Sequence, residues 1–331
     1  MRILAGDIGG TNVRLAIFES EGTDLVEIRR ERYPTSAFAG IDAVVASFLR
    51  PDDKIEATGL GVCGPVSGRH AFGTNLPWDV DGADLERRVP VGPVVVVNDL
   101  AANGLGLPRL APSDFAVLNQ GIPDPQGSAV LISPGTGLGE GILVRQPDGS
   151  LRPIPSEGGH CTFAPRTERE MDLQRFLSHE FGHVSCERVL SGPGLVNIYR
   201  FLRQRSGRPE PEWLAARAAA HGGDLAPVIS KAALAGEESV CMQALETFVS
   251  ILGAEAANLA LKALATGGVF IGGGIPPKIL PKLLDGTFFT AFCDKGRFGP
   301  ALARIPVKVV LNDDAALLGG AVAAKSAGSG L

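Results

Sequence analysis

Asn98 and Asp99 stand where an acid could do chemistry, directly after four consecutive valines at 94–97. Such a β-branched run predicts a fully buried strand. Ligands of open α/β sheets bind at the carboxyl ends of the strands, so Asp99 is placed where a general base would act on a hydroxyl group. The same pair is also an ordinary helix N-cap, which is the more frequent structure for this sequence. A near copy, Asn312-Asp313, follows a second apolar strand, and both copies cannot be the catalytic centre.

A glycine turn at residues 8–12, the first glycine turn, connects two predicted strands near the start of the chain. Gly9 and Gly10 carry no Cβ, so backbone N–H groups can approach an anion, and the turn suits phosphate oxygens. Gly-Gly turns are more often plain hairpins than phosphate loops. Asp7 favours the phosphate interpretation, because a carboxylate beside such a turn commonly holds Mg²⁺ through its water shell.

A second glycine turn, residues 134–139, repeats this arrangement further along the chain. It reads Pro-Gly-Thr-Gly-Leu-Gly and lies between predicted strands at 128–133 and 140–144. Two such hairpins, each followed by further strands and helices, predict two like domains that face one another across a nucleotide. The turn is not a Walker A loop, because no lysine in the sequence follows a glycine.

Other glycine-rich segments carry groups suited to a sugar and to adenosine. Glu157 and His160 lie three residues apart and can converge on the hydroxyl groups of a polyol, although a surface loop in which His160 caps a neighbouring group is the commoner structure. Glu187 precedes another glycine turn and is either a third polyol ligand or an ordinary helix acid. Three glycines at 272–274 follow a predicted strand at 269–271, where bare backbone suits an adenosine.

Residues 179–183 match the His-Glu-x-x-His motif of zinc peptidases, in which two histidines on one helical turn bind Zn²⁺. Gly182 lies inside the motif and argues against this function, because glycine weakens the helix on which both ligands must share one rigid face. Metal analysis of the purified protein would test it.

Composition narrows the classes of function. A length of 331 residues predicts roughly two domains, and 45% hydrophobic with 20% charged residues is an ordinary balance for a globular protein. A net charge of -5 without a Lys/Arg-rich run argues against a nucleic acid partner. Glu255 and Lys262 interrupt the longest apolar stretch, so no membrane span is predicted. Asp7 interrupts the apolar segment at the N-terminus, so no signal peptide is predicted. Five scattered cysteines indicate reduced thiols in a cytoplasm.

The elements that must position these groups alternate between strands and helices, which predicts a sheet flanked by helices. Before the valine strand they are a helix at 40–49, a strand at 55–63 and a helix at 83–88. A boundary is expected at 104–108, which is rich in glycine and ends in proline. Residues 211–266 are helical by pattern, and their apolar face predicts core or an oligomer interface rather than a reactive site.

In this order, and over the whole chain, the motifs resemble those of the bacterial glucokinases of the actin-like sugar kinase ATPase superfamily. The resemblance implies an α/β fold of two actin-like (ribonuclease H-like) domains with an interdomain cleft. We expect a small domain at 1–107 plus 306–331, and a large domain at 108–305.

The resemblance also assigns roles to individual residues. Asp99 becomes the catalytic base, and the sugar is held by Asn98, Glu157, His160 and Glu187. The first phosphate loop comprises Gly6, Asp7, Ile8, Gly9, Gly10, Thr11 and Asn12. The rest of the nucleotide site comprises Gly135, Thr136 and Gly137 at the phosphates, and Gly272, Gly273 and Gly274 at the adenosine.

The implied reaction is transfer of a phosphoryl group from ATP, with Mg²⁺, to the 6-hydroxyl of D-glucose, which is the first step of glycolysis. The resemblance further implies a cytoplasmic homodimer. Repressor-type sugar kinases carry a cysteine-rich zinc motif after the matching Glu-x-Gly-His, and here only Cys161 follows, so no zinc is expected.

Two alternatives share these motifs. A kinase for mannose or N-acetylglucosamine differs only in its preferred hexose, which a panel of substrates would reveal. A catalytically idle sugar-sensing regulator usually carries a DNA-binding helix-turn-helix before the kinase-like core, and the position of Asp7 leaves no room for one.

Overall fold

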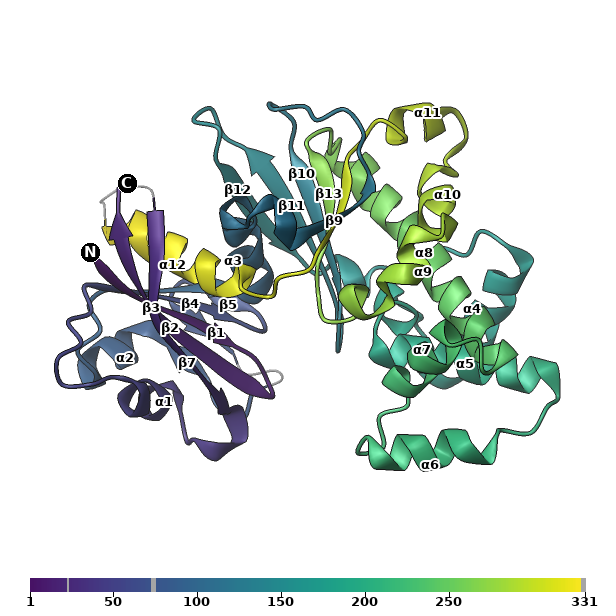
Figure 1. Cartoon of the computed structure of the whole chain (residues 1–331), viewed down its shortest axis with the longest axis horizontal. Coiled ribbons are helices and arrows are strands. Elements are labelled where there is room, and N and C mark those ends of the chain that lie inside the picture. The colour runs from purple at the N-terminus through teal and green to yellow at the C-terminus, as the bar shows by residue number, and fades with distance from the viewer. Residues whose placement is uncertain (23, 73–75, 329–331) are drawn as a thin grey trace. The chain divides into compact units, whose positions relative to one another are not determined.

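The computed structural model describes residues 1–22, 24–72 and 76–328. The chain divides into two compact α/β units (Figure 1). Unit 1 comprises Met1–Pro112, Ser150–Pro155 and Asn312–Leu331, and unit 2 comprises Ser113–Gly149 and Ser156–Leu311.

Unit 1 is built on a five-stranded sheet with the strand order β3-β2-β1-β4-β8. The strands are β1 (Arg2–Ile8), β2 (Asn12–Glu21), β3 (Asp24–Pro34), β4 (Ala57–Val62) and β8 (Val94–Asn98). β1, β4 and β8 run parallel, so their carboxyl ends meet at one edge, whereas β2 and β3 are antiparallel. A small three-stranded sheet contains β5 (Val66–Ser67), β6 (His70–Ala71) and β7 (Val80–Asp81).

Helices cover both faces of the unit 1 sheet. They are α1 (Ile41–Phe48), α2 (Gly82–Arg88), α3 (Asp99–Gly106) and α12 (Ala315–Gly328). The apolar side of α1 joins the cluster of Leu4, Leu15 and Leu60, while Leu317 of α12 packs with Ile3 on the other face. A Cβ at Gly59 of β4 would lie 1.9 Å from the carbonyl oxygen of Gly320, so α12 rests directly on the sheet backbone (Figure 1).

Unit 2 contains a six-stranded sheet with the order β12-β11-β10-β13-β14-β9. The strands are β9 (Phe115–Asn119), β10 (Ala129–Pro134), β11 (Leu138–Arg145), β12 (Leu151–Ser156), β13 (Gly268–Ile271) and β14 (Val307–Val310). β10, β13 and β14 are parallel, and β11 and β9 are antiparallel to their neighbours. The division of the chain places most of the edge strand β12 with unit 1.

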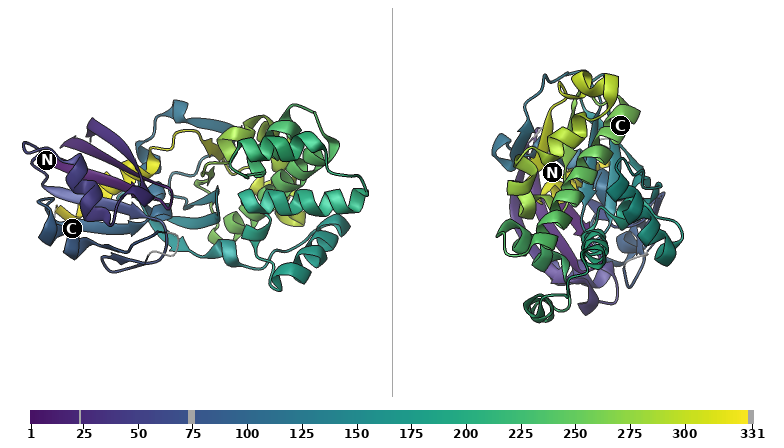
Figure 2. Two further views of the ribbon diagram at one scale, coloured as in Figure 1. Left: turned by 90° about the horizontal axis from the view of Figure 1, so that it is seen from below. Right: turned by 90° about the vertical axis from the view of Figure 1, so that its right-hand side faces the viewer.

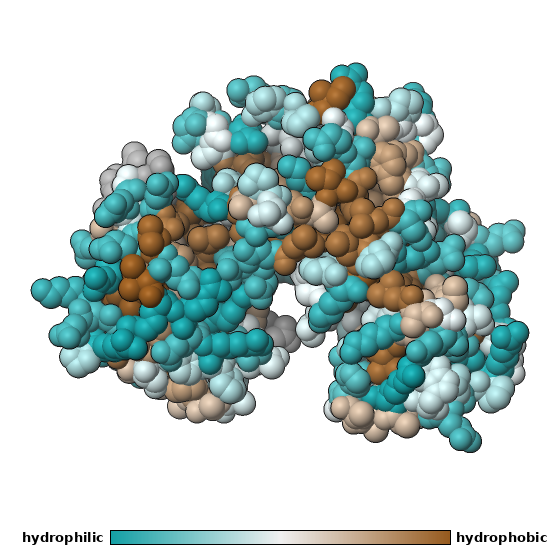
Figure 3. Space-filling view, viewed as in Figure 1, coloured by the Kyte–Doolittle hydropathy of each residue, from teal (hydrophilic) through white to brown (hydrophobic). Residues whose placement is uncertain are grey.

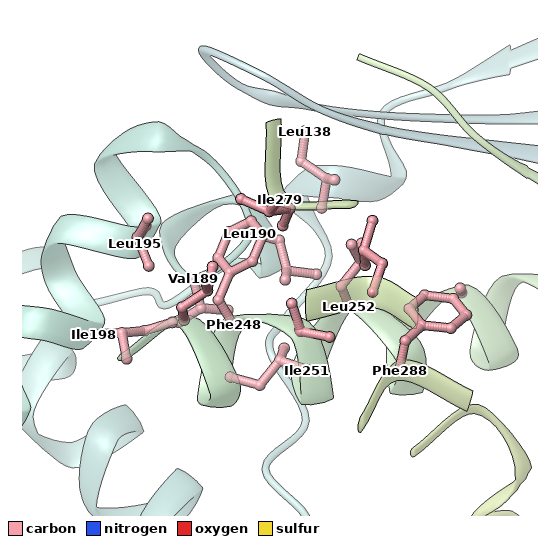
Figure 4. Close-up of a cluster of buried hydrophobic side chains, with 14 of the residues drawn as sticks. Leu138, Val189, Leu190, Leu195, Ile198, Phe248, Ile251, Leu252, Ile279 and Phe288 are labelled. Carbon is pink, nitrogen blue, oxygen red and sulfur yellow. The ribbon is translucent and has the colours of Figure 1, made fainter. Parts of the chain in front are cut away.

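The helices of unit 2 gather beside this sheet (Figure 2). They are α4 (Glu168–Phe181), α5 (Gly192–Ser206), α6 (Glu212–Ala220), α7 (Ala226–Leu234), α8 (Ser239–Ala263), α9 (Leu280–Leu284), α10 (Thr287–Cys293) and α11 (Gly299–Leu302). In the described part of the chain α8 alone has the length and hydropathy of a membrane span, but 78% of its apolar window is buried in the unit. Figure 4 shows Phe248, Ile251 and Leu252 of α8 inside the core cluster.

Several sequence predictions are confirmed and one boundary is wrong. Both glycine hairpins form, as β1–β2 and β10–β11, and 211–266 is largely helical, as α6, α7 and α8. The predicted assignment of 306–331 to the first domain fails for β14, because Val307–Val310 pair with β13 and β9 inside the unit 2 sheet. Strand β3 was not foreseen because its exposed face is charged and has no regular apolar period.

Candidate active site

The carboxyl edge of the parallel strands in unit 1 brings together Asp7, Cys63 and Asp99. The register aligns Ile8 of β1 with Val62 of β4, and Val62 with Asn98 of β8. Burial, together with the negative charges of Asp99 and Asp7, raises the pKa of the Cys63 thiol to about 11. Both carboxylates therefore lie close enough to Cys63 to act on its charge, and two acids predicted from separate parts of the sequence share one edge.

Asn98 and Asp99 form the start of α3. Asn98 is the N-cap, because its Oδ1 accepts hydrogen bonds from the N–H groups of Leu100 at 3.0 Å and Ala101 at 3.4 Å. Its Nδ2 donates to the carbonyl of Gly64 at 3.0 Å, so the amide is fixed from both ends. Asp99 follows in the first turn, a favourable place for a negative charge, and its Oδ1 accepts from the N–H of Leu100 at 2.8 Å.

The first glycine turn is closed by its own backbone and by the next segment. The N–H of Gly9 donates to the carbonyl of Asn12 at 2.9 Å. Thr35 holds the other side, donating its Oγ1 to the carbonyl of Gly9 at 2.7 Å and its N–H to that of Thr11 at 3.0 Å. Gly10 and Thr11 are exposed at the tip, which leaves them accessible to a ligand.

Arg14 pairs with Asp7 across the hairpin, a contact that the sequence reasoning missed. Its Nε and Nη2 donate to Asp7 Oδ2 at 3.0 and 2.8 Å. The same guanidinium donates to the carbonyl of Asp313 at 2.7 Å and forms an ion pair with the Asp313 carboxylate at 2.7 Å. Residues 7 and 14 face each other in the β1–β2 register, which a closer reading of the hairpin would have shown.

Burial raises the pKa of Asp7, and the charge of Arg14 opposes that rise. Asp7 Oδ1 has no hydrogen bond to any described residue, so one carboxylate oxygen remains for a ligand. No group of three or more His, Cys, Asp or Glu side chains suited to a metal occurs within residues 1–22, 24–72 and 76–328. A Mg²⁺ ion at Asp7 would therefore take most of its ligands from water and phosphate, as Mg²⁺ commonly does.

The second glycine turn is closed by a hydrogen bond from the N–H of Gly135 to the carbonyl of Gly137 at 2.8 Å. The N–H of Gly192, at the start of α5, donates to the carbonyl of Gly135 at 2.8 Å. Gly273, from the predicted adenosine segment, has a φ of 86° and packs so closely that a Cβ there would lie 2.4 Å from the Pro134 carbonyl oxygen. The glycines expected at the phosphates and at the adenosine thus adjoin one another in unit 2.

Glu157 is the N-cap of the short 3-10 helix η4 (Gly158–His160), His160 is its last residue, and the two side chains lie together. Their Oε2 and Nε2 atoms are 3.8 Å apart, and the side chains are 75% and 62% exposed. Glu187, in η5 (Cys186–Arg188), is half-buried and accepts a hydrogen bond at Oε2 from the N–H of Leu138 at 3.0 Å. It therefore lies in a 3-10 helix against the second glycine turn rather than in an ordinary helix.

Glu140 of β11 is a buried acid that no pattern in the sequence indicates. It is 2% exposed, and its Oε1 has no hydrogen-bond partner among the described residues. Burial raises its pKa to about 7, and the nearby charge of Glu255 contributes to the rise. A Cβ at Gly158 would lie 2.3 Å from Glu140 Oε2, so the carboxyl packs directly against the loop of Glu157 and His160.

The zinc peptidase motif does not form a shared face. Helix α4 ends at Phe181, and Gly182 is its C-cap with a φ of 67°. His183 consequently lies outside the helix that carries His179, and its Nε2 lies 3.1 Å from Thr162 Oγ1. Gly182 acts here as the sequence analysis expected.

Comparisons with known proteins agree over nearly the full length. Residues 4–327 match the Glucokinase family model. A glucokinase from Nostoc sp. is 39% identical over 337 residues, which cover 97% of this chain and 98% of the relative. The crystal structure of a glucokinase from an Antarctic psychrotroph is 32% identical, with a TM-score of 0.85 and coverage of 98% and 99%. A ROK family glucokinase from Streptomyces griseus, solved with glucose and AMPPNP, shares the fold at 23% identity, a TM-score of 0.66 and coverage of 98% and 100%.

Proposed function

This chain belongs to the glucokinase family and phosphorylates D-glucose with ATP, and we propose that Asp99 is the general base of that reaction. The observation that carries the assignment is the position of Asp99 at the carboxyl edge of β8, beside Asp7 and the first glycine turn. Asp99 accepts the proton of the 6-hydroxyl as that oxygen attacks the terminal phosphorus of ATP.

Most of the rate enhancement is expected to come from alignment rather than from covalent chemistry by the protein. Holding the hydroxyl and the phosphate in line can remove roughly 7 to 11 kcal/mol from the barrier. Exposed N–H groups of the two glycine turns stabilise the charge that develops on the phosphate oxygens. Asp7 would hold Mg²⁺ through water, and the ion would add positive charge at the phosphates.

Glu157, His160 and Glu187 are assigned to the sugar, together with Asn98. The exposure of Glu157 and His160 supports this role, because their polar atoms are open to a ligand. Glu187 Oε1 has no hydrogen bond within the described ranges and is available to a sugar hydroxyl. Asn98 retains one N–H for the sugar, since its other amide contacts are to the backbone of unit 1.

Asp99→Asn tests the assignment, because asparagine keeps the shape and removes the base. We expect kcat to fall by roughly 10² to 10⁴ while the Kd for glucose stays within about tenfold. A coupled assay measures kcat and calorimetry measures the Kd. Asp52→Asn is the control, as Asp52 is an exposed acid of the same unit, and its kcat should match the wild type. Unchanged turnover in Asp99→Asn would refute the role of Asp99.

The family likeness also supports a cytoplasmic homodimer that supplies glucose 6-phosphate to glycolysis. All five cysteines, which lie in the described part of the chain, are free thiols, as a reducing compartment favours. Hydrophobic residues gather on the face of unit 2 seen in Figure 3, where an apolar patch suits a protein partner. Light scattering tests the dimer, and a mass of 34.4 kDa in solution would contradict it.

A further inference from the structure

Glu187 links the sugar-binding segment of unit 2 to the second glycine turn. Its Oε2 accepts a hydrogen bond from the N–H of Leu138, a residue of that turn, at 3.0 Å. A hydrogen bond to a carboxylate is about twice as strong as one between neutral groups, so the contact fixes the Gly137–Leu138 peptide. The backbone adds a second link, from Gly192 to Gly135 at 2.8 Å.

Gly137 is what allows the carboxylate to come so close. A Cβ at Gly137 would lie 2.5 Å from Glu187 Oε2 and 3.4 Å from its carboxyl carbon. The φ of Gly137 is outside the left-handed region, so its backbone conformation does not require glycine. The absent side chain at this position therefore serves the contact with Glu187.

Leu138 is the residue at which the sugar-binding segments meet the turn. A Cβ at Gly159, inside the loop of Glu157 and His160, would lie 2.1 Å from the Leu138 carbonyl oxygen. The Leu138 side chain is buried in the same core cluster as Val189 and Leu190, which follow Glu187 in the chain (Figure 4). The core thus fixes the backbone on both sides of the Glu187 contact, and the half-buried carboxylate is the part of the link that can still move.

We propose that Glu187 is a positioning residue that couples sugar binding to nucleotide binding, by sharing its carboxylate between the sugar and the Leu138 N–H. This inference rests on the proposed function, in which Glu187 Oε1 takes a sugar hydroxyl. Without sugar the contact depends on one hydrogen bond of a half-buried, flexible side chain. A sugar on Oε1 holds Oε2 on the Leu138 N–H and thereby orders the second glycine turn for phosphate.

Coupling of this kind is reciprocal, because the sugar must raise nucleotide affinity by the same factor as the nucleotide raises sugar affinity. We expect a factor of roughly 5 to 150, the usual range for coupled sites. Calorimetry with a non-hydrolysable ATP analogue, with and without saturating glucose, measures it without turnover.

Gly137→Ala is the decisive variant, since its methyl displaces Glu187 Oε2 from the Leu138 N–H. Oε1 of Glu187 and the other sugar-binding side chains stay available to the sugar. The added methyl meets only the far end of a flexible side chain, so the fold should survive. The coupling factor should fall to within about twofold of unity, while glucose affinity in the absence of nucleotide stays within about threefold of wild type. A Gly137→Ala protein that keeps the wild-type coupling factor would overturn the proposal.

Gly135→Ala is the matched control from the same turn. A Cβ at Gly135 meets no atom within 4 Å among the described residues, and the φ of Gly135 is also outside the left-handed region. Its methyl points into the space assigned to phosphate, so nucleotide affinity should drop whether or not glucose is present. The coupling factor should remain that of the wild type, and its loss in Gly135→Ala would show that any disturbance of the turn removes coupling.

The coupling measurement separates this inference from the proposed function. If wild-type protein binds no glucose, the sugar assignment fails along with the inference. If glucose and the analogue both bind but neither changes the affinity of the other, the coupling role of Glu187 is wrong and the role of Asp99 is untouched. Glu187→Ala should lose both glucose affinity and coupling, and retention of coupling in that variant would also contradict the proposal.

Discussion

The two glycine hairpins have similar turns, but the acid at each turn comes from a different part of the chain. In the first, Asp7 and Arg14 face each other across β1 and β2, so the acid and its partner belong to the hairpin itself. In the second, the equivalent pair is Ser133 and Gly139, and the acid at the turn is Glu187 from a distant segment. The first turn is therefore held by fixed partners within unit 1, namely Arg14, Thr35 and Asp313, whereas the second can respond to what Glu187 binds.

The acids next to the two turns also differ in how burial is offset. Asp7 is held by two hydrogen bonds from Arg14. Glu140 lies in β11, directly after the second glycine turn. It is buried, and its Oε1 has no hydrogen-bond partner among the described residues. A hydrogen-bonded cation thus opposes the burial of the acid at the first hairpin, and no hydrogen bond to Oε1 does so at the second among the described residues. Burial of Glu140 therefore makes the stability of unit 2 depend on pH.

The largest expected effect is the removal of that dependence by Glu140→Gln. The folded pKa is about 7 and the ordinary value is 4.5, so between these pH values the folded chain keeps a proton that the unfolded chain releases. The contribution of Glu140 to stability should therefore fall by about 3 kcal/mol as pH rises through this window, and change no further above it. Urea unfolding at about pH 5 and about pH 8 measures the free energies, and Glu140→Gln should lack this component.

Glu246→Gln is the control for that comparison, because Glu246 is an exposed acid on α8. Its free energy of unfolding should follow the wild type across the pH range. An identical pH dependence in wild type and Glu140→Gln would mean that the second hairpin is compensated after all.

A smaller effect is expected from breaking the pair at the first hairpin. Arg14→Ala leaves Asp7 without its cation, and both side chains are largely covered, at 20% and 22% exposed. We expect a loss of about 2 kcal/mol in the free energy of unfolding, between the values for surface and fully buried pairs. Arg32, the exposed cross-strand neighbour of Arg14, provides the control, and Arg32→Ala should change stability by less than about 0.5 kcal/mol. Equal losses in the two variants would remove the contrast between the hairpins.

The smallest effect concerns the turn glycines themselves. A Cβ at Gly9 would lie 3.1 Å from the carbonyl oxygen of Asn12 in the same turn, whereas one at Gly135 meets open space among the described residues. Gly135→Ala should raise stability by about 0.5 kcal/mol through the unfolded state, and Gly9→Ala should lower it by about as much. Chemical denaturation resolves such a difference, and the opposite order would show that the first turn is the looser one.

The sequence predicted what depends on short-range pattern. Both hairpins and the valine strand could be placed because alternation and turn glycines lie within a few residues of one another. The unit to which β14 belongs could not be predicted, because the residues of a short strand do not indicate which strands it pairs with. Its neighbours β13 and β9 both lie more than 35 residues earlier in the sequence. The contact of Glu187 with Leu138 and the burial of Glu140 also arise only when distant segments pack together.

Helix α12, which covers one face of the unit 1 sheet, is the last part of the chain to be synthesised. The segment that completes this unit begins at Asn312, about 200 residues after Pro112, so a ribosome needs roughly 10 to 40 s to reach it. During that time the apolar face formed by Ile3, Ala5 and Phe18 has no helix to cover it. Nascent chains should therefore bind chaperones through their amino-terminal strands until translation ends, and truncation before residue 312 should leave them aggregation-prone.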